Sequence, residues 1–518
     1  MPTPRYHGGA ALVNIPLSVP GFRGLNKQQQ SSTLGPEWAT RMENCVFDDS
    51  SRLASRKGWS KITTTPASVD EFVTLFSYVQ NDGTEELIGT TSTAIYASAD
   101  GGTSWTEVTG TASFTDGQWH FVNFNDRVYG FQTGMAPIYY SGTSFASVAD
   151  VNAPTGGVGL SAFGRLWVVD ADGVTVKYSA LLDGTDWTSV DDAGQISLQN
   201  VWSRQDTVKA LAAFNGALVI FGKWNILFYT DGRGSAIGLD PLYMYLVDTI
   251  SGTGCIAQKS VQEVNGDLWF IGPQGLMSLG RLIQEKSNPL ENLSKNVQDW
   301  FSDLVGRTPE QSIRTVFDPE ERLFLVSLPN GAGAGTAVAF DTRGFMEDGS
   351  VRCAGAWNGL VPTDMVLTED YTLIMAKYGN TGEVGKYFGH LDDSSSFQTI
   401  YESGWLDLDN GKHLKILKRM DGIFYIDRAA SVTFKWAFDF EDTFKRKSLS
   451  FADAGISAEF NIAEFNLAEF SGGVTLRKGR VPASRKGEYV KIGIEVLNDG
   501  FEFSLQELEL FARIGRLA

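Results

Sequence analysis

One arrangement of apolar and polar residues recurs through the middle of the chain: a short apolar stretch, a turn that contains Asn, Asp or Gly, and a second apolar stretch. Asn-Gly or Asn-Asp between two apolar stretches predicts a β-hairpin, because both turn positions need a positive φ. The first copy has a longer turn and is the weakest of the seven. The copies are Leu75–Gly89, Phe121–Gly130, Leu160–Val169, Leu211–Phe221, Val261–Ile271, Val316–Val326 and Val366–Met375.

These hairpins are evenly spaced. The first apolar residues after their turns lie 41, 38, 52, 50, 55 and 50 residues apart, and a third apolar stretch follows most copies. A propeller blade takes roughly 40–50 residues, so the spacing predicts a β-propeller of about seven blades over residues 71–400. A pair of meandering β-sheets is the alternative, but it does not require so even a spacing.

One segment departs from the strand pattern. Within Ser287–Arg307, apolar residues recur at helical spacing, which predicts a helix on the outside of a propeller blade. Ser287 or Asn288 is the expected cap, and Gly306 is expected to end the helix. The apolar positions are Leu290, Leu293, Val297, Trp300, Phe301 and Leu304.

The two ends of the chain have a different texture. Residues 401–518 contain strands of clean alternation, such as Val432–Phe438 and Tyr489–Val496, and are predicted to form a β-sandwich or platform domain. The quasi-repeat Ala458–Phe470 fits neither a strand nor a helix and is interpreted as an ordered arm or edge segment. Residues 1–70 are irregular and are predicted to be an extended arm that forms part of the platform. The predicted fold class is therefore all-β.

Composition agrees with many short strands joined by tight turns, since the chain has 56 glycines and 12% aromatic residues. The net charge of −18 is unevenly distributed. Residues 71–400 hold 18 Lys and Arg against 38 Asp and Glu, a net of −20, while residues 401–518 hold 17 against 18. A protein that grips phosphate backbones needs basic clusters, so this acidity argues against that class.

Candidate chemistry is sparse. The cysteines Cys45, Cys255 and Cys353 lie far apart, which favours small buried apolar residues over metal ligands. No Walker loop, H-E-x-x-H or nucleophile elbow is present, so no catalytic residue, metal site or cofactor is predicted. The alternating glycines from Gly331 to Gly335 are interpreted as a hairpin loop, and Asp170 with Asp172 as a turn.

The longest nearly apolar stretch, Ala210–Gly222, covers 13 residues, and a membrane helix needs about 20. The chain is therefore expected to lack a membrane segment and to be made in a cytoplasm before assembly.

The stretch from Ser98 to Trp105 matches the Asp-box pattern S-x-D-x-G-x-x-W. This pattern resembles that of sialidase-like propellers, in which Asp100 would bond turn amides, Gly102 would fit the turn and Trp105 would pack between blades. The match marks a fold and carries no chemistry. Sialidases also clamp a carboxylate with three arginines. Arg127, Arg165 and Arg204 are interpreted as isolated surface residues, but a paired-carboxylate glycosidase stays open as an alternative.

The opening of the chain contains a set of recurrent positions: Gly24, Leu25, Asn26, Asn44, Arg56 and Gly58. With these residues it resembles the opening of podovirus (short-tailed bacteriophage) tail nozzle or tail hub proteins, also called tail tubular protein B. Further stretches with the same resemblance follow in order, at Gly252–Leu279, Gly404–Leu408 and Gly515-Arg516, while Ser50 or Ser51 stands where glycine is more usual.

The resemblance implies a structural virion protein rather than an enzyme. Its subunits would form a homohexameric ring at the distal end of a phage tail. That ring would dock on an adaptor (gatekeeper) ring, carry tail fibres or spikes, and line or gate the channel through which double-stranded DNA is ejected. The implied fold is a propeller with a platform domain made from both chain ends. A carbohydrate-binding or glycoside-hydrolysing, sialidase-like propeller is the alternative, and an intracellular scaffold propeller is a third.

Overall fold

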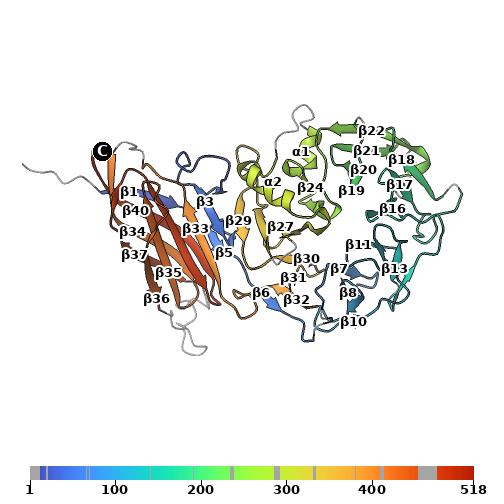
Figure 1. Cartoon of the computed structure of the whole chain (residues 1–518), viewed down its shortest axis with the longest axis horizontal. Coiled ribbons are helices and arrows are strands. Elements are labelled where there is room, and N and C mark those ends of the chain that lie inside the picture. The colour runs from blue at the N-terminus through green and yellow to red at the C-terminus, as the bar shows by residue number, and fades with distance from the viewer. Residues whose placement is uncertain are drawn as a thin grey trace, which may run out of the picture.

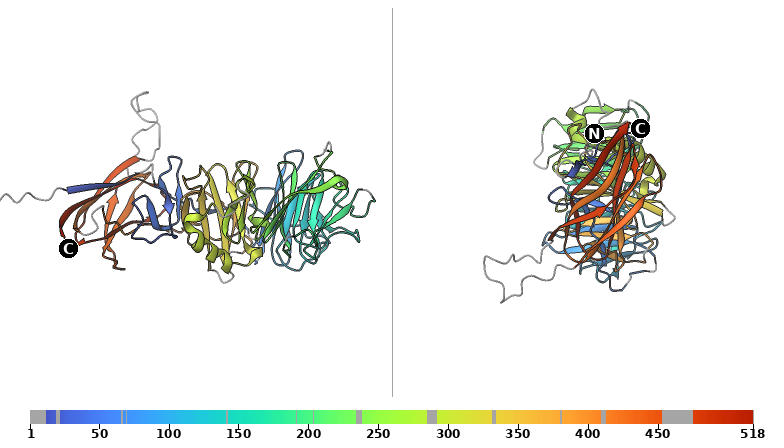
Figure 2. Two further views of the ribbon diagram at one scale, coloured as in Figure 1. Left: turned by 90° about the horizontal axis from the view of Figure 1, so that it is seen from above. Right: turned by 90° about the vertical axis from the view of Figure 1, so that its left-hand side faces the viewer.

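The computed structural model describes residues 12–18, 22–65, 67–68, 70–140, 142–190, 192–202, 204–233, 238–284, 292–330, 334–379, 381–408, 413–452 and 475–517. Most of the secondary-structure elements in this part of the chain are β-strands, and helices are few. The strands form two parts that lie end to end: a ring of small sheets, and a pair of long twisted sheets (Figures 1 and 2). The all-β prediction is confirmed.

The ring is built from antiparallel sheets whose strands follow one another in chain order. The first three sheets are β7 (Thr74–Val79) to β10 (Thr106–Glu107), β11 (His120–Phe124) to β14 (Phe145–Ser147), and β15 (Gly159–Ala162) to β18 (Gly194–Ser197). The later ones are β19 (Val208–Phe214) to β22 (Met244–Ser251), β23 (Gln262–Val264) to β25 (Gly275–Ser278), β26 (Arg314–Asp318) to β29 (Cys353–Trp357), and β30 (Pro362–Leu367) to β32 (Val384–Tyr387).

The first strands of these sheets line the centre of the ring. Strand β7 contacts β11, β11 contacts β15, and β15 contacts β19. A short 3-10 turn, η2 (Gln258–Ser260), lies between β19 and β26, and β26 contacts β30. Strand β30 contacts β7, so the circle returns to its first sheet. The arrangement is propeller-like (Figure 1).

The hairpin turns have the backbone that the sequence predicts. Asn125 and Asp126 between β11 and β12 have φ values of 46° and 57°. Asn215-Gly216 and Asn265-Gly266 are likewise positive at both positions. All seven predicted hairpins are present as paired antiparallel strands, so this prediction is confirmed.

The last sheet of the ring is completed from the other end of the chain. Strand β6 (Trp59–Lys61) pairs with β32 as the outer strand of that sheet. The sixth sheet is extended in a different way, because its outer strand β29 lies parallel to β3 (Trp38–Glu43). Through this contact the sixth sheet continues into one of the long sheets.

The long sheets take strands from both chain ends. One sheet has the order β37-β34-β40-β5-β4, with β1 beside β40, and the other continues from β3 through β33, β39 and β35 to β36. They pack face to face, with Phe424 of β34 and Phe434 of β35 in edge contact at 5.8 Å. The bounds are β1 Leu12–Ser18, β2 Gly24–Leu25, β4 Cys45–Phe47, β5 Leu53–Ser55, β33 Phe397–Ser403, β34 His413–Ile426, β35 Ala430–Phe438, β36 Lys445–Phe451, β37 Thr475–Pro482, β38 Lys486–Gly487, β39 Val490–Asn498 and β40 Phe503–Leu517.

The region predicted to be an irregular arm is therefore partly regular. Among the described part of residues 1–70 there are six strands, β1 to β6. Most of their partners, such as β40, β33 and β32, lie several hundred residues away in sequence, so no local periodicity marks them. The quasi-repeat Ala458–Phe470 lies outside the described residues.

The predicted helix over 287–307 is shorter in the structure. It begins as a 3-10 turn at Lys295–Val297 and continues as α2 (Gln298–Arg307), which contains Gly306. Leu293 is not helical, because its N–H donates to the Leu276 carbonyl at 2.7 Å and holds it beside β25. Residues 285–291, with the predicted cap, lie outside the described residues.

Phe301 of α2 is buried and meets Phe340 of β28 edge-on at 5.3 Å, which packs the helix on the sixth sheet. A second short helix, α1 (Leu279–Gln284), was not predicted. Among the described residues, no helix combines the length and apolar character needed to span a membrane.

Candidate functional sites at the junction and the ring axis

The structure brings together three of the residues that carry the family resemblance. Arg56 is fully buried between the ring and the long sheets, and it forms a bidentate pair with Asp392 at 2.8 and 2.6 Å. Its Nε donates to Asn44 Oδ1 at 3.0 Å, and its guanidinium lies 4.0 Å from the centre of the Phe397 ring. These residues, with Gly58, are called the junction cluster here. All three side-chain nitrogens of Arg56 donate to protein acceptors, so the cluster holds two parts of the fold together.

Asn44 and Gly58 are required by the backbone at this place. Asn44 has a φ of 54°, a conformation that Asn tolerates better than most residues. Its amide donates to the Gln398 carbonyl at 2.8 Å, while its carbonyl oxygen accepts from the Asn358 N–H at 2.9 Å. A Cβ on Gly58 would lie 2.0 Å from the Leu391 carbonyl oxygen, so only glycine fits. Both positions serve packing and backbone geometry.

The remaining motif residues lie near the start of β3. Gly24 has a φ of 92°, and a Cβ there would lie 2.6 Å from the Cys353 carbonyl oxygen. Leu25 is buried in the core. Asn26 is also buried, and its Oδ1 accepts from the N–H groups of the next turn at 3.0 and 3.1 Å. The structure does not bring these three residues into the junction cluster.

The Asp-box residues form a closed turn between β9 and β10. Asp100 accepts from the Ser98 hydroxyl at 2.8 Å and from Ser104, and hydrogen bonds from Ser104 lower the pKa of Asp100 to about 2. The Trp105 Nε1 donates to the Gly102 carbonyl at 3.1 Å. Trp105 packs on Phe72 with ring centres 4.6 Å apart.

The Asp-box turn joins the first and last sheets of the ring. The Gly102 carbonyl accepts from Thr63 at 2.9 Å, and a Cβ on Gly102 would lie 2.6 Å from Val384 of β32. A similar turn occurs at Trp187, whose Nε1 donates to the Gly184 carbonyl at 3.1 Å. The sequence pattern missed this turn because Ala180 and Leu182 stand where the Asp box has Ser and Asp.

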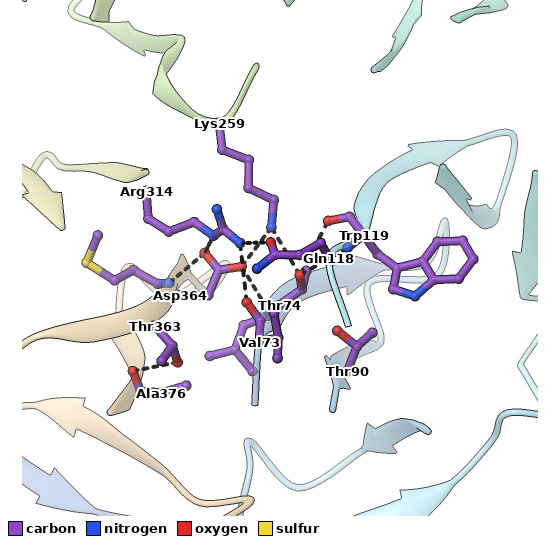
Figure 3. A network of polar contacts seen from close by, with 12 residues as sticks. Val73, Thr74, Thr90, Gln118, Trp119, Lys259, Arg314, Thr363, Asp364 and Ala376 are labelled. Carbon is purple, nitrogen blue, oxygen red and sulfur yellow. Dashed lines mark hydrogen bonds and ion pairs between the residues drawn. The ribbon is translucent and has the colours of Figure 1, made fainter. Parts of the chain in front are cut away.

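A second ionic cluster lies at the centre of the ring and was not found from the sequence (Figure 3). Asp364 at the start of β30 accepts from Lys259 Nζ of η2 at 2.9 Å and from the Leu75 N–H of β7 at 2.9 Å. Arg314 at the start of β26 lies 3.2 Å from the other carboxylate oxygen. We call Asp364, Lys259 and Arg314 the axial cluster. Its members come from separate elements of the ring, so it ties the first sheet to the later ones.

The other bonds of the axial cluster extend this connection. Arg314 donates to the Gln118 side chain at 2.6 Å, just before β11, and to the Val73 carbonyl at 3.4 Å. Lys259 donates to the Thr74 hydroxyl at 3.3 Å. In Figure 3, the side chains of Arg314 and Lys259 point from different elements toward Asp364.

Burial and mutual charge set the ionisation of this cluster. Burial alone would raise the pKa of Asp364, but Lys259 and Arg314 outweigh it and lower that pKa below its ordinary value. Burial, with a contribution from Arg314, lowers the pKa of Lys259 to about 8. Burial and then Lys259 lower the pKa of His120 to about 4, so this imidazole is neutral at pH 7.

The other candidate residues from the sequence are buried or are bonded within the fold. The three cysteines are buried, as predicted, and burial raises the pKa of each thiol. Asp170 pairs with Lys177 at 2.9 Å, and Asp172 accepts backbone N–H groups in a turn. Within the described residues, no group of three or more His, Cys, Asp or Glu side chains is placed to hold a metal ion. Strands β27 and β28, which flank the glycine-rich stretch, pair as antiparallel neighbours, while residues 331–333 lie outside the described residues.

The interpretation of Arg165 as a surface residue is wrong. Arg165 is only 8% exposed and pairs with Asp192 at 2.7 Å. It also donates to the Ser179 carbonyl at 2.8 Å, so it holds the loop that follows β17. The sequence around Arg165 did not indicate this burial, because its partners Ser179 and Asp192 belong to the long loop after β17.

Comparisons with known proteins find distant similarity to solved structures and no family. No family model matches the chain, and no curated protein matches it. Among solved structures, the designed protein Ika8 is similar with 10% identity, a TM-score of 0.36, and 64% of this chain and 99% of that chain covered. BamB from Moraxella catarrhalis has 12% identity and a TM-score of 0.35, covering 60% and 81%. An exo-beta-1,3-galactanase from Phanerochaete chrysosporium has 7% identity and a TM-score of 0.23, covering 78% and 98%.

Proposed function

We propose that this chain is a non-enzymatic structural subunit of a phage virion, the nozzle or hub of a short tail. The observation that carries the proposal is the junction cluster. Asn44, Arg56 and Gly58, which carry the resemblance to tail nozzle proteins, lie together where the ring meets sheets built from both chain ends. That is where a propeller with a platform made from both chain ends needs a rigid connection.

We count the ring as a seven-bladed propeller. Strand β6 then closes the last blade by supplying its outer strand from the N-terminal side, beside three strands from residues 362–387. Such closure ties distant parts of the chain together and resists opening of the circle. The two long sheets are the platform in this proposal, and their strands β1, β3 and β40 are the ones that hold the chain ends in place.

In the assembled tail, six subunits form a ring that docks on the adaptor and supports fibres or spikes. The central region of each subunit has 38 acidic and 18 basic residues. Six such regions around one axis favour a negative lumen, which repels DNA phosphates and lets the genome pass without being held. Lysine substitutions at lumen positions are expected to slow DNA ejection. Unchanged ejection with several lysines installed would remove this part of the proposal.

The oligomeric state of the chain is the first test of the proposal. Light scattering of the purified chain, alone and with its adaptor ring, is expected to give a mass of six subunits in at least the second sample. The matched control is the chain carrying Arg56→Met, in which the junction is broken and assembly is expected to fall. A monomer in both samples of the unmodified chain contradicts the proposal.

A second candidate function is supported by the Asp-box turn. Ser98, Asp100, Gly102 and Trp105 adopt the closed turn described above, as this pattern does in sialidase-like propellers. The alternative is a carbohydrate-binding or glycoside-hydrolysing propeller. A panel of glycans, assayed for binding and for release of reducing ends, separates the two. Turnover of any glycan by a monomer favours this alternative over the tail subunit.

A further inference from the structure

One mouth of the ring contains a pocket of about 320 Å³. Its walls come from the inner strands β11 and β19, from η2, and from the start of β26. A volume of this size matches the lower end of small-ligand sites, which span roughly 300–1,000 Å³. The side chains that matter here are Gln118, His120, Lys209, Lys259, Glu310 and Arg314.

The charge of this pocket is opposite to that of its surroundings. Its lining has three cations, Lys209, Lys259 and Arg314, and a single carboxylate, Glu310. The region of residues 71–400 as a whole has a net charge of −20. The Glu310 carboxylate is already paired with two cations. Its oxygens lie 2.7 Å from Lys209 Nζ and 3.8 Å from Lys223 Nζ. Cations therefore exceed carboxylates at this mouth, even with Asp364 counted behind the wall.

Lys259 has a donor to spare. Its ammonium has three N–H groups, and two are directed at Asp364 (2.9 Å) and Thr74 (3.3 Å). No further acceptor for it occurs among the residues that the structure describes. The side chain of Lys259 is 21% exposed, in contrast to 2% for Arg314, whose two terminal nitrogens donate to protein groups. Lys259 is thus the member of the axial cluster that a ligand can reach.

We propose that this mouth of the ring binds a small oxyanion, with Lys259 as its principal contact and Lys209 as the second. Carboxylates and phosphates share the chemistry that these ammonium groups recognise. Arg314 and Asp364 position Lys259 from behind. The proposal does not depend on the assembly of the tail, because all the residues belong to one chain.

Binding is expected to depend on pH through Lys259. The charged and titratable groups around it are Asp364 on β30, Arg314 on β26 and His120 on β11, with Lys209 and Glu310 at the rim. Because the pKa of Lys259 is lowered to about 8, its positive charge is lost at a milder pH than for an ordinary lysine. Anion affinity is therefore expected to fall between about pH 7 and about pH 9.5.

The experiment is isothermal titration of the full chain with inorganic phosphate and, separately, with succinate. Succinate is the cleaner probe of pH, because it stays fully ionised across this range. Lys259→Met is expected to weaken binding by about tenfold or more and to remove the pH dependence. Lys209→Met is expected to weaken it by about threefold, with the pH dependence kept. Lys478→Met, on the exposed edge strand β37, is the matched control and is expected to bind normally.

Each outcome decides the proposal. Binding of succinate and phosphate alike indicates a general oxyanion site, and binding of one alone identifies the ligand class. If Lys259→Met does not fold, as judged by circular dichroism, the Lys209→Met result and the pH profile of the unmodified chain carry the test. Absence of binding to the unmodified chain at about 20 mM of either probe, well above the millimolar range of weak sites, overturns the proposal. Equal binding by folded Lys259→Met also overturns it.

Discussion

The junction cluster and the axial cluster use the same chemistry for different ends. Each pairs a buried carboxylate with a buried arginine and joins elements that are far apart in the chain. At the junction, Arg56 is fully enclosed, and Asn44 and Phe397 fill the space around it. At the axis, Lys259 adds a third charge, and its side chain lines a pocket. A closed cluster fixes geometry only, whereas an open one also offers a site.

The largest expected effect is at the junction. Arg56→Met leaves Asp392 buried without its partner and is expected to lower the free energy of unfolding by about 3–5 kcal/mol. The measurement is urea denaturation followed by fluorescence. Arg307→Met is the control, because Arg307 is 66% exposed and, among the described residues, pairs only with Asp303 one helical turn away. Equal stability of the two variants would show that the junction does not hold the two parts together.

A smaller effect is expected at the axis. Asp364→Asn removes the negative charge between Lys259 and Arg314 and is expected to lower the free energy of unfolding by about 2–3 kcal/mol. The loss is smaller than at the junction because Lys259 reaches solvent and gives up its proton readily. The double variant Asp364→Asn with Lys259→Met is expected to recover part of the loss. Denaturation showing further loss in the double variant would contradict the view that repulsion between the two cations is the cause.

A third buried carboxylate extends the comparison to the long sheets. Glu402 is 4% exposed and lies 2.7 Å from Lys435 and 2.8 Å from Lys491. Burial would raise its pKa, but these lysines outweigh burial and lower the pKa to about 2. Because the folded pKa lies below the unfolded value of about 4.3, the stabilisation is complete above that value and is lost as the pH falls toward 2.

Acid denaturation measures this directly. Between about pH 4.5 and about pH 2, the unmodified chain is expected to lose about 2 kcal/mol more stability than Glu402→Gln does. Glu441→Gln is the control, since Glu441 is exposed and pairs with Arg485 at the surface. Parallel pH profiles for the unmodified chain and Glu402→Gln would show that this carboxylate adds no stability of its own.

The smallest effect is expected at the Asp box. Trp105 is partly buried against Phe72, so Trp105→Ala is expected to lower the free energy of unfolding by about 1–2 kcal/mol. The thermal unfolding midpoint is expected to fall by a few degrees. Val190→Ala, at a side chain 87% exposed, is the control. A change in glycan binding with unchanged stability would instead show that this turn contributes to glycan binding.

What the sequence predicted was local. The turns Asn125-Asp126, Asn215-Gly216 and Asn265-Gly266 were correct because their φ values follow from the residues themselves. The helix start was wrong because a backbone bond from Leu293 to Leu276 overrides periodicity. Strands β1, β3, β5 and β6 were missed because distant strands complete them. Strands β2 and β4, of two and three residues, are too short for a periodicity to mark them.

The two clusters differ in the same way. The resemblance picked out Asn44, Arg56 and Gly58 before their contacts were known, although not their partner Asp392. Nothing marked Lys259, Arg314 and Asp364, which are separated by 55 and 50 residues and stand beside ordinary apolar strands. Only closure of the ring places them together, so a local pattern carries no trace of the site.

The measurement that tests the central claim most directly is negative-stain electron microscopy of the purified chain, alone and mixed with its adaptor ring. The account predicts class averages with six-fold symmetry, in which each of six units shows one small ring joined to an elongated part. Averages that show only single subunits in both mixtures, or an assembly of another symmetry, would contradict it.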